Sequence, residues 1–253
     1  MQLVLLTALG IGGATIIGSI IGFLFKNASH SFTDIILGFA AGVMMSASVI
    51  GLVLPSLEYG TRPYALIVTV AGVFCGAFCL NLIDKIVPHL HGLTGTKDET
   101  LNRDNAQLQK VLLFVIAIGI HNLPEGIAAG VSFGTGNVSD ALLVAGGIAL
   151  QNIPEGMVII APLLAVGVNP WRTFFIAAFT GLIEVAGTLI GFFAVNVSAF
   201  ILPFALAFAG GTMIYVVSDE MIPETHAHGN ERGATYALLA GFCLMIAMDY
   251  LLS

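Results

Sequence analysis

Apolar residues follow one another along this chain in long runs that are separated by short polar segments. Eight runs of about 20 residues or more can be drawn, at 3–25, 34–58, 63–84, 111–133, 140–166, 172–196, 200–219 and 233–252. A helix of that length rises ~30 Å, which matches the hydrocarbon core of a bilayer, and it satisfies its own backbone hydrogen bonds there. The pattern predicts an all-α polytopic membrane protein with eight transmembrane helices.

Composition supports a membrane protein. The chain has 253 residues, of which 57% are hydrophobic and only 9% are charged, whereas a soluble domain is about 25% charged. So few charges could not cover a water-soluble globule of this size. Residues 1–253 are therefore predicted to form one transmembrane domain, with one long polar loop at about 85–110. No cluster of Lys and Arg suggests a nucleic-acid partner.

The Lys and Arg residues orient the predicted bundle. If the N-terminus lies outside, seven of the eight fall on the cytoplasmic side: Lys26, Lys85, Lys97, Arg103, Lys110, Arg172 and Arg232. Arg62 falls on the outside. This distribution obeys the positive-inside rule. Because the number of helices is even, both termini are predicted to lie outside the cytoplasm.

Small residues four positions apart predict close packing between these helices. Such pairs are Gly18/Gly22, Gly38/Gly42, Gly126/Gly130 and Gly187/Gly191. Glycine pairs at this spacing let two helix backbones approach each other in a membrane.

Two similar polar motifs interrupt the apolar runs. "HNLPEG" covers residues 121–126, and "QNIPEG" covers residues 151–156. Counted along their helices, His121, Gln151 and Glu184 all lie near the middle of the bilayer. Three carboxylates, those of Glu125, Glu155 and Glu184, are thus expected there, and each costs ~3 kcal/mol when ionised. The predicted spans place no Lys or Arg at that depth, which leaves protonation, water or a bound cation to balance them.

Helical geometry favours the cation. With His121 set at zero around the helix axis, Glu125 lies at ~40° and Asn122 at ~100°. Glu125 can therefore share one ligand set with His121 and another with Asn122. Two such motifs on facing antiparallel helices could enclose two adjacent metal positions bridged by the two glutamates. Pro124 and Pro154 are expected to kink the helices and to free carbonyls beside this site.

The ligand types narrow the choice of ion, because imidazole with carboxylate suits zinc and neighbouring divalent metals. The first predicted position uses one imidazole, one amide and two carboxylates: His121, Gln151, Glu125 and Glu155. The second position adds two amides and one carboxylate: Asn122, Asn152 and Glu184. Because these additions bring one further negative charge, the second position is expected to bind a dication more weakly.

These motifs resemble those of the ZIP family of divalent-metal transporters, and in particular its bacterial GufA-like subgroup. "HNLPEG" is similar to the family's metal-binding signature and "QNIPEG" to its partner on the fifth helix. Glu184 is similar to the carboxylate on the sixth helix. Met44, in "AAGVMMSAS", matches a position where a methionine approaches the first metal, with Met45 as the alternative register. Gln151 and Asn152 depart from the histidine and aspartate that many members and close relatives carry.

The resemblance implies the fold, function and location. It implies a ZIP-like bundle with an inverted repeat in an inner membrane, and uptake of zinc or related metals (cadmium, iron, manganese) into the cytoplasm. Movement is expected to resemble an elevator, with the first, fourth, fifth and sixth helices sliding against the rest. The resemblance implies a transporter rather than an enzyme, no cofactor beyond the transported metal, and a plausible homodimer.

Two other functions are weighed against transport of metal. An intramembrane zinc metallohydrolase would need a general base beside an open metal position, and no H-E-x-x-H occurs. A proton-coupled solute carrier would use the glutamates as a relay, but no Lys or Arg is placed to hold an organic anion.

A second tier of polar residues is expected at the cytoplasmic side, where released metal could be collected. One group lies in "SDEMIPETHAHGNE": Asp219, Glu220, Glu224, His226 and His228. The other lies in the long loop: His89 and His91.

Overall fold

The computed structural model describes the backbone of residues 1–59, 63–93, 103–197 and 201–252. It leaves out the side chains of residues 84–93, 103–114, 117, 196–197 and 252. Everything below refers to this described part of the chain.

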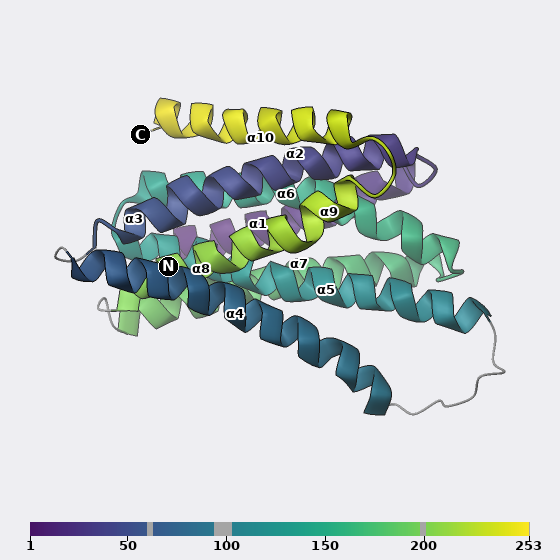
Figure 1. Ribbon diagram of the computed structural model, residues 1–253, viewed down its shortest axis with the longest axis horizontal. Coiled ribbons are helices and arrows are strands. Elements are labelled where there is room, and N and C mark those ends of the chain that lie inside the picture. The colour runs from purple at the N-terminus through teal and green to yellow at the C-terminus, as the bar shows by residue number, and fades with distance from the viewer. Residues whose placement is uncertain (60–62, 94–102, 198–200, 253) are drawn as a thin grey trace.

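Eight rod-like helical units make up the described structure. Six are single helices: α1 (Gln2–Leu24), α4 (Tyr64–Leu93), α5 (Arg103–Ser132), α6 (Val138–Ala165), α7 (Pro170–Val197) and α10 (Glu231–Leu252). The other two are composite, joining α2 (His30–Ser48) to α3 (Leu54–Ser56) and α8 (Leu202–Val216) to α9 (Ile222–Thr225). Seven of the eight, all but α5, are long and apolar enough to cross a membrane in their described residues. Both termini lie at the same end of the bundle (Figure 1).

The eight predicted helices are confirmed, but several of their ends differ. α2 begins at His30, because the Ser29 side chain caps it by accepting a hydrogen bond from the Phe32 amide. The predicted loop at 85–110 is mostly helical, since α4 continues to Leu93 and α5 begins at Arg103. Hydropathy locates the segment that lies in hydrocarbon, whereas a helix can continue into water beyond it.

Each composite unit contains a π-helical turn just before a proline. These turns are Val49–Val53 in the first unit and Val217–Met221 in the second. Pro55 and Pro223 follow them within two residues. Because proline cannot donate to the carbonyl four residues earlier, the wider turn accommodates it without ending the helix. The second composite unit therefore extends to Thr225 instead of ending at 219. Its π-helical turn carries Asp219, which is exposed, and Glu220, which is partly buried.

Glycine contacts join α1, α5, α6 and α7 into one group. A Cβ atom on Gly126 would collide with the α7 backbone at Glu184, and one on Gly187 would collide with the α5 backbone. Gly18 lies equally close to the α6 backbone, Gly156 to the α1 backbone, and Gly181 to the α1 backbone. Backbones that touch in this way are expected to move together.

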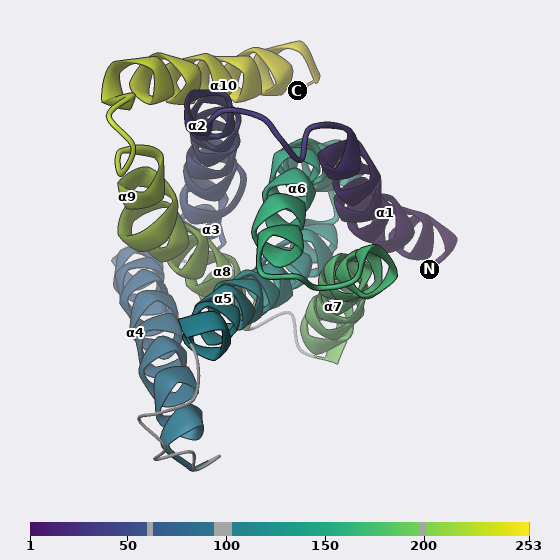
Figure 2. The same cartoon turned by 90° about the vertical axis from the view of Figure 1, so that its right-hand side faces the viewer.

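A second group contains α2, α4, α8 and α10. Gly42 and Gly241 bring α2 and α10 into backbone contact, and Gly76 and Gly211 do the same for α4 and α8. Gly210 of α8 lies next to the Ser48 carbonyl of α2. Figure 2, which looks along the helices, shows α2, α4, α8 and α10 on one side and α1, α5, α6 and α7 on the other.

Side chains fill the boundary between the two groups. A Cβ on Gly51 would meet the Val144 side chain of α6, and one on Gly147 would meet the Met245 side chain of α10. No described glycine brings the backbones of the two groups into contact of the kind seen within each group. At the described glycines, the boundary is therefore packed through side chains and not backbone to backbone.

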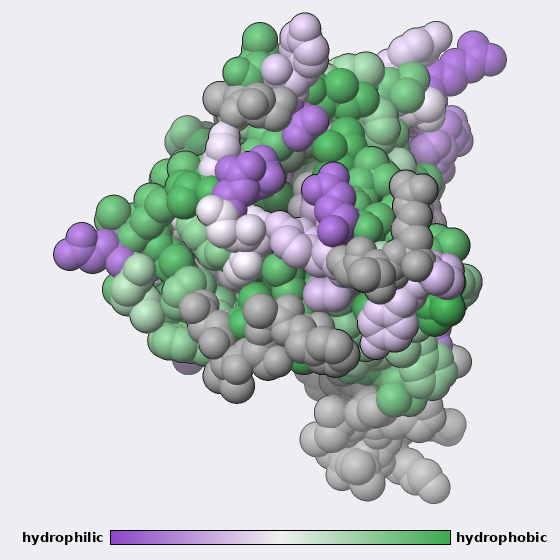
Figure 3. All heavy atoms as spheres, turned by 90° about the vertical axis from the view of Figure 1, so that its left-hand side faces the viewer, coloured by the Kyte–Doolittle hydropathy of each residue, from purple (hydrophilic) through white to green (hydrophobic). Residues whose placement is uncertain are grey.

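The end of the bundle that carries both termini is sealed by packed side chains. Met44, Leu52, Val144 and Ile148 are all fully buried there, in one hydrophobic cluster. Viewed from this end, several hydrophilic residues lie in the middle of the face and hydrophobic residues cover much of the rest (Figure 3). This is the distribution expected of a bundle end that meets water while its sides meet lipid.

Candidate metal centre

The centre lies where α5, α6 and α7 cross near their middles. The absence of a side chain at Gly126 lets α5 approach α7 at the level of Glu184. Asn122 of α5 and Asn152 of α6 both donate hydrogen bonds to Glu184 of α7, over 2.5 and 2.6 Å. The structure therefore brings the two motifs and Glu184 together in one layer, as the sequence predicted.

Glu184 is the most firmly held of the three carboxylates. Besides the two asparagine amides, it accepts a hydrogen bond from the Thr15 hydroxyl of α1 over 2.8 Å. The Nδ2 atom of Asn152 also lies 3.3 Å from the Ile11 carbonyl of α1. Both asparagine side chains therefore point their NH2 groups toward Glu184. Their Oδ1 atoms take no part in these hydrogen bonds.

Unpaired polar atoms concentrate at this layer. Ten buried side-chain nitrogen or oxygen atoms lack a hydrogen-bond partner among the described residues, and seven of them belong to the two motifs. These seven are His121 Nε2, Asn122 Oδ1, both Oε atoms of Glu125, Oε1 and Nε2 of Gln151, and Oδ1 of Asn152. Buried polar atoms are normally paired, so a cluster of unpaired ones calls for an unseen ion or water. Most of them are oxygen or imidazole atoms of the kind that bind divalent metals.

The two glutamates of the motifs lie between the helices in antiparallel register. Glu125 is within electrostatic range of Glu155 and Glu184, and Glu155 is within range of His121. Glu125 is fully buried and Glu155 is 7% exposed. The two motif carboxylates therefore lie in one electrostatic cluster with Glu184 and His121.

Glu220, which sequence reasoning placed at the cytoplasmic mouth, belongs to this centre. Its Oε1 lies 2.7 Å from Nε2 of His121, although the two atoms lack hydrogen-bond alignment. The π-helical turn before Pro223 carries Glu220 to this position. The sequence signal was Pro223 just beyond the apolar run, because a proline that continues a helix leaves a carbonyl unpaired one turn earlier.

A cavity leads from the centre toward the end opposite the termini. It holds about 380 Å³ and is lined by His121, Glu155, Glu220, Asp219 and Glu224, among others. Carboxylates thus continue from the buried site along the π-helical turn Val217–Met221 and α9.

Glu224 also lines a second cavity of about 380 Å³ near that end. There, Nδ1 of His228 lies 3.0 Å from Oδ1 of the buried Asp34, and the His228 ring stacks on His30 with centroids 4.5 Å apart. His228 therefore lies beside further polar residues at this end of the bundle.

The ring of His226 makes hydrogen-bond contacts at both nitrogens. Its Nδ1 lies 2.7 Å from the Ile222 carbonyl and 3.0 Å from the Thr225 hydroxyl, and its Nε2 lies 3.4 Å from the Thr235 hydroxyl. The Nδ1 contacts stay within α9, and the Nε2 contact joins the end of α9 to α10. The side chains of His89 and His91 lie outside the described residues.

The methionines and prolines that were predicted to lie beside the site occupy different surroundings. Met44 is fully buried in the cluster that seals the site toward the termini, and Met45 is only partly buried against the same cluster. Pro124 lines an apolar groove on a different side of α5, and Pro154 lines another surface depression. Both proline rings thus line surfaces that the ligand residues do not line.

Among the described residues, no three His, Cys, Asp or Glu side chains lie close enough to bind a metal by themselves. A metal at this centre therefore depends on amide oxygens from Asn122, Gln151 or Asn152 in addition to imidazole and carboxylate. Such a mixed set binds a hard or borderline dication without holding it as tightly as a structural zinc site.

The chain is similar in sequence to known zinc transporters. The model of a family described as "ZIP Zinc transporter" matches residues 89–249. The chain is 38% identical over 250 residues to zinc transporter GufA of Myxococcus xanthus, covering 97% of both chains. It is 39% identical over 241 residues to zinc transporter ZIPB of Bordetella bronchiseptica, covering 93% of this chain and 77% of that protein. It is 37% identical over 247 residues to zinc transporter ZupT of Chlorobaculum parvum, covering 92% and 91%.

Proposed function

The chain belongs to the ZIP family of zinc transporters, and from this premise we infer that its zinc crosses the membrane through the centre between α5, α6 and α7. The protein is a multi-pass membrane transporter of zinc and not an enzyme. The metallohydrolase and the solute carrier are accordingly set aside.

The cluster of seven unpaired buried atoms is the observation that supports this location. Leaving a buried polar atom unpaired costs about 1–3 kcal/mol, and more for a charged one. A transport site accepts this cost because its cargo must arrive and leave. A dication between Glu125 and Glu155 would neutralise both and would supply the missing partners.

We place one zinc position among His121, Glu125, Gln151 and Glu155, with Met44 bordering it on the side of the termini. A second position, bounded by Asn122, Asn152 and Glu184, is expected to bind more weakly. Glu184 already accepts three hydrogen bonds, so a metal there would have to compete with Thr15 and the two amides. The second position is therefore expected to stay empty at low zinc concentrations.

The described conformation favours release toward the end opposite the termini. Cavities lined by Glu220, Glu224 and His228 lead that way, whereas Met44 and Val144 are packed on the other side. The positive-inside distribution of Lys and Arg supports a cytoplasmic location for this open end. We therefore infer uptake into the cytoplasm, driven by a membrane potential worth about 4.6 kcal/mol per 100 mV for a dication.

The two glycine-packed groups supply a means of movement. α1, α5, α6 and α7 hold one another by backbone contact and carry the predicted ligands of the motifs together with Glu184. Where a glycine lies on the boundary with α2, α4, α8 and α10, the atoms nearest to it from the other group belong to side chains. The first group can therefore slide as one body, which would carry the metal past the sealing cluster, and Glu220 on the second group would receive it.

Uptake into proteoliposomes tests the site. We expect saturable zinc uptake by the wild type and loss of at least nine-tenths of it in the His121→Ala and Glu125→Ala variants. Glu58→Ala, at an exposed helix end, is the matched control and should transport normally. Normal uptake by both site variants at matched folding would show that zinc takes another route. Parallel assays with cadmium, iron and manganese would define selectivity, which Gln151 is expected to relax.

We also propose a homodimer, as the family resemblance suggests. Light scattering from the detergent-solubilised protein, corrected for bound detergent, would give twice the chain mass. A mass of one chain across the accessible concentrations would contradict the proposal.

A further inference from the structure

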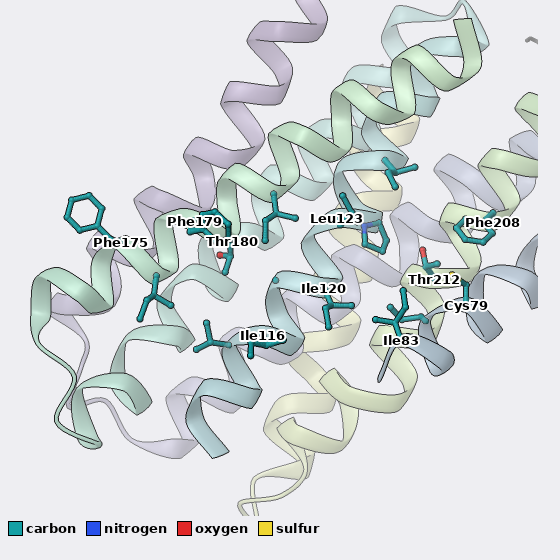
Figure 4. Close-up of a pocket in the computed structure, with 17 residues that line it drawn as sticks. Cys79, Ile83, Ile116, Ile120, Leu123, Phe175, Phe179, Thr180, Phe208 and Thr212 are labelled. Atoms are coloured by element: carbon teal, nitrogen blue, oxygen red, sulfur yellow. The ribbon is translucent and has the colours of Figure 1, made fainter. Parts of the chain in front are cut away.

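A large apolar groove lies over α5, on a face that also carries Pro124. Its volume is about 920 Å³. Ile120 of α5 contributes to its floor, Phe179 of α7 to one wall, and Cys79 of α4 and Phe208 of α8 to the other (Figure 4). None of the predicted zinc ligands lines it.

The groove opens toward the bilayer and is closed at its back. Phe175 and Phe179 at the mouth are 64% and 62% exposed. Leu80 and Thr212 at the back are 1% and 2% exposed. A hollow of this shape in the side of a membrane-spanning bundle is exposed to lipid tails and not to water.

The chemistry of the lining selects hydrocarbon as the occupant. Fifteen of its 17 lining residues are apolar or glycine, and the exceptions are Thr180 and Thr212. The Thr180 and Thr212 hydroxyls already donate to the Ala177 and Ala209 carbonyls of their own helices. An unfilled hollow forfeits the dispersion contacts of its walls, whereas a flexible hydrocarbon chain restores them.

A row of aromatic side chains leads along α7 toward the groove. Trp171, Phe175 and Phe179 follow one another at four-residue spacing and therefore share one face of the helix. The rings of Trp171 and Phe175 stack with centroids 6.4 Å apart. Tryptophan concentrates at the membrane–water interface, and the exposed Arg172 beside it offers a positive charge to a lipid phosphate.

We propose that the groove is a binding site for one acyl chain of an anionic phospholipid. The headgroup phosphate lies at Trp171 and Arg172, and the chain passes Phe175 and Phe179 to end near Phe208. The two walls belong to the two helix groups, because α7 lies in one and α4 and α8 in the other. Resting on the two-group movement proposed above, an acyl chain in the groove stabilises one relative position of the groups and so tunes the rate of zinc transport.

Fluorescence quenching can detect the acyl chain, because Trp171 is the chain's single tryptophan. The reporter protein carries Trp171→Phe and Phe208→Trp, which places one indole at the deep end of the groove. It is reconstituted into phosphatidylglycerol vesicles whose acyl chains are brominated near their ends, or into unbrominated ones. We expect the brominated lipid to quench the indole at least twofold.

Two substitutions on α4 distinguish a lipid chain bound in the groove from the lipid that surrounds the whole protein. Cys79→Phe fills the groove from its wall, whereas Cys75→Phe adds the same bulk one turn away at an exposed position outside it. Cys79→Phe should remove most of the quenching, and Cys75→Phe should leave it unchanged. Absence of quenching in the reporter, or quenching that survives Cys79→Phe, would overturn the proposed site. A protein with Trp171→Phe and Phe179→Trp, at the exposed mouth, verifies that quenching works in each preparation.

This readout does not depend on zinc, so it separates the lipid site from the proposed function. If quenching behaves as expected but the protein moves no zinc, the acyl-chain site stands and the transport route fails. Zinc uptake by Cys79→Phe relative to Cys75→Phe then tests the coupling. At least a twofold difference in rate is expected, and equal rates would overturn the effect on transport.

Discussion

Substituting Glu125 by glutamine should raise stability and abolish zinc binding at the same time. The Glu125 side chain is fully buried, both its oxygens lack hydrogen-bond partners among the described residues, and Glu155 and Glu184 lie within electrostatic range. An ionised side chain in the middle of a bilayer costs ~3 kcal/mol. Because Glu125→Gln keeps the shape and removes the charge, the metal-free protein should gain about 1–3 kcal/mol of stability.

Zinc should reverse which of the two proteins, wild type or Glu125→Gln, is the more stable. At a zinc concentration 100 times the dissociation constant, binding stabilises the wild type by about 2.7 kcal/mol. Glu125→Gln removes a carboxylate that would bridge the metal positions, so it should lose most of this gain. The variant is therefore expected to be more stable than wild type in a chelator and less stable in zinc.

Both stability differences, in chelator and in zinc, can be measured by heating the protein in detergent and then applying it to gel filtration. The readout is the temperature at which half the protein remains monodisperse. A difference of 1 kcal/mol corresponds to about 2–4 °C for a chain of this size. Glu58→Gln makes the same chemical change at an exposed position and should shift neither temperature. If Glu125→Gln lowered stability in the chelator and kept the full zinc-dependent shift, the carboxylate would be structural and the proposed site would be wrong.

Three further changes test separate parts of the structure. Gly126→Ala should destabilise the protein by about 1–3 kcal/mol, because the new methyl group would collide with the Glu184 carbonyl. The control Gly13→Ala adds a methyl group that faces open space, and it should be neutral in the same thermal assay. Gln151→His should raise the preference for zinc over manganese at least tenfold in competition binding, because imidazole is the softer ligand, and an unchanged ratio would remove Gln151 from the site. Glu220→Gln should lower the zinc uptake rate at least threefold and change the equilibrium affinity for zinc by less than twofold. The reason is that Glu220 lies beside His121 but belongs to the other helix group. A large loss of affinity with normal turnover would instead make Glu220 a ligand of the resting site.

Much of the fold could be predicted from the sequence because the bilayer imposes local rules. An apolar run of 20 residues forms a helix wherever it lies in lipid, since no other backbone arrangement of a single segment satisfies its polar groups. The glycine pairs were also readable, and Gly126 and Gly187 do lie at backbone contacts. Helix ends beyond the membrane were not predictable from hydropathy, as the continuation of α4 to Leu93 illustrates.

The sequence likewise marked the polar centre, because a carboxylate placed in hydrocarbon needs a compensating partner whatever the packing around it. Glu125, Glu155 and Glu184 were identified by that reasoning, and His121 by its equal depth and its place one helical turn before Glu125. Their depth followed from counting residues along each helix, and the hydrogen bonds from Asn122 and Asn152 to Glu184 bear out that α5, α6 and α7 meet at one level.

Tertiary structure decided which partner each polar group has. Glu220 reaches His121 because a π-helical turn rotates the end of α8, and His226 contacts Thr235 of α10. The groove over α5 exists because α4 and α7 stand apart on either side of it. Burial in lipid is a property of one segment and can be read from its own residues. Contacts between helices depend on their crossing angles and on turns at single prolines, which combine residues far apart in the chain.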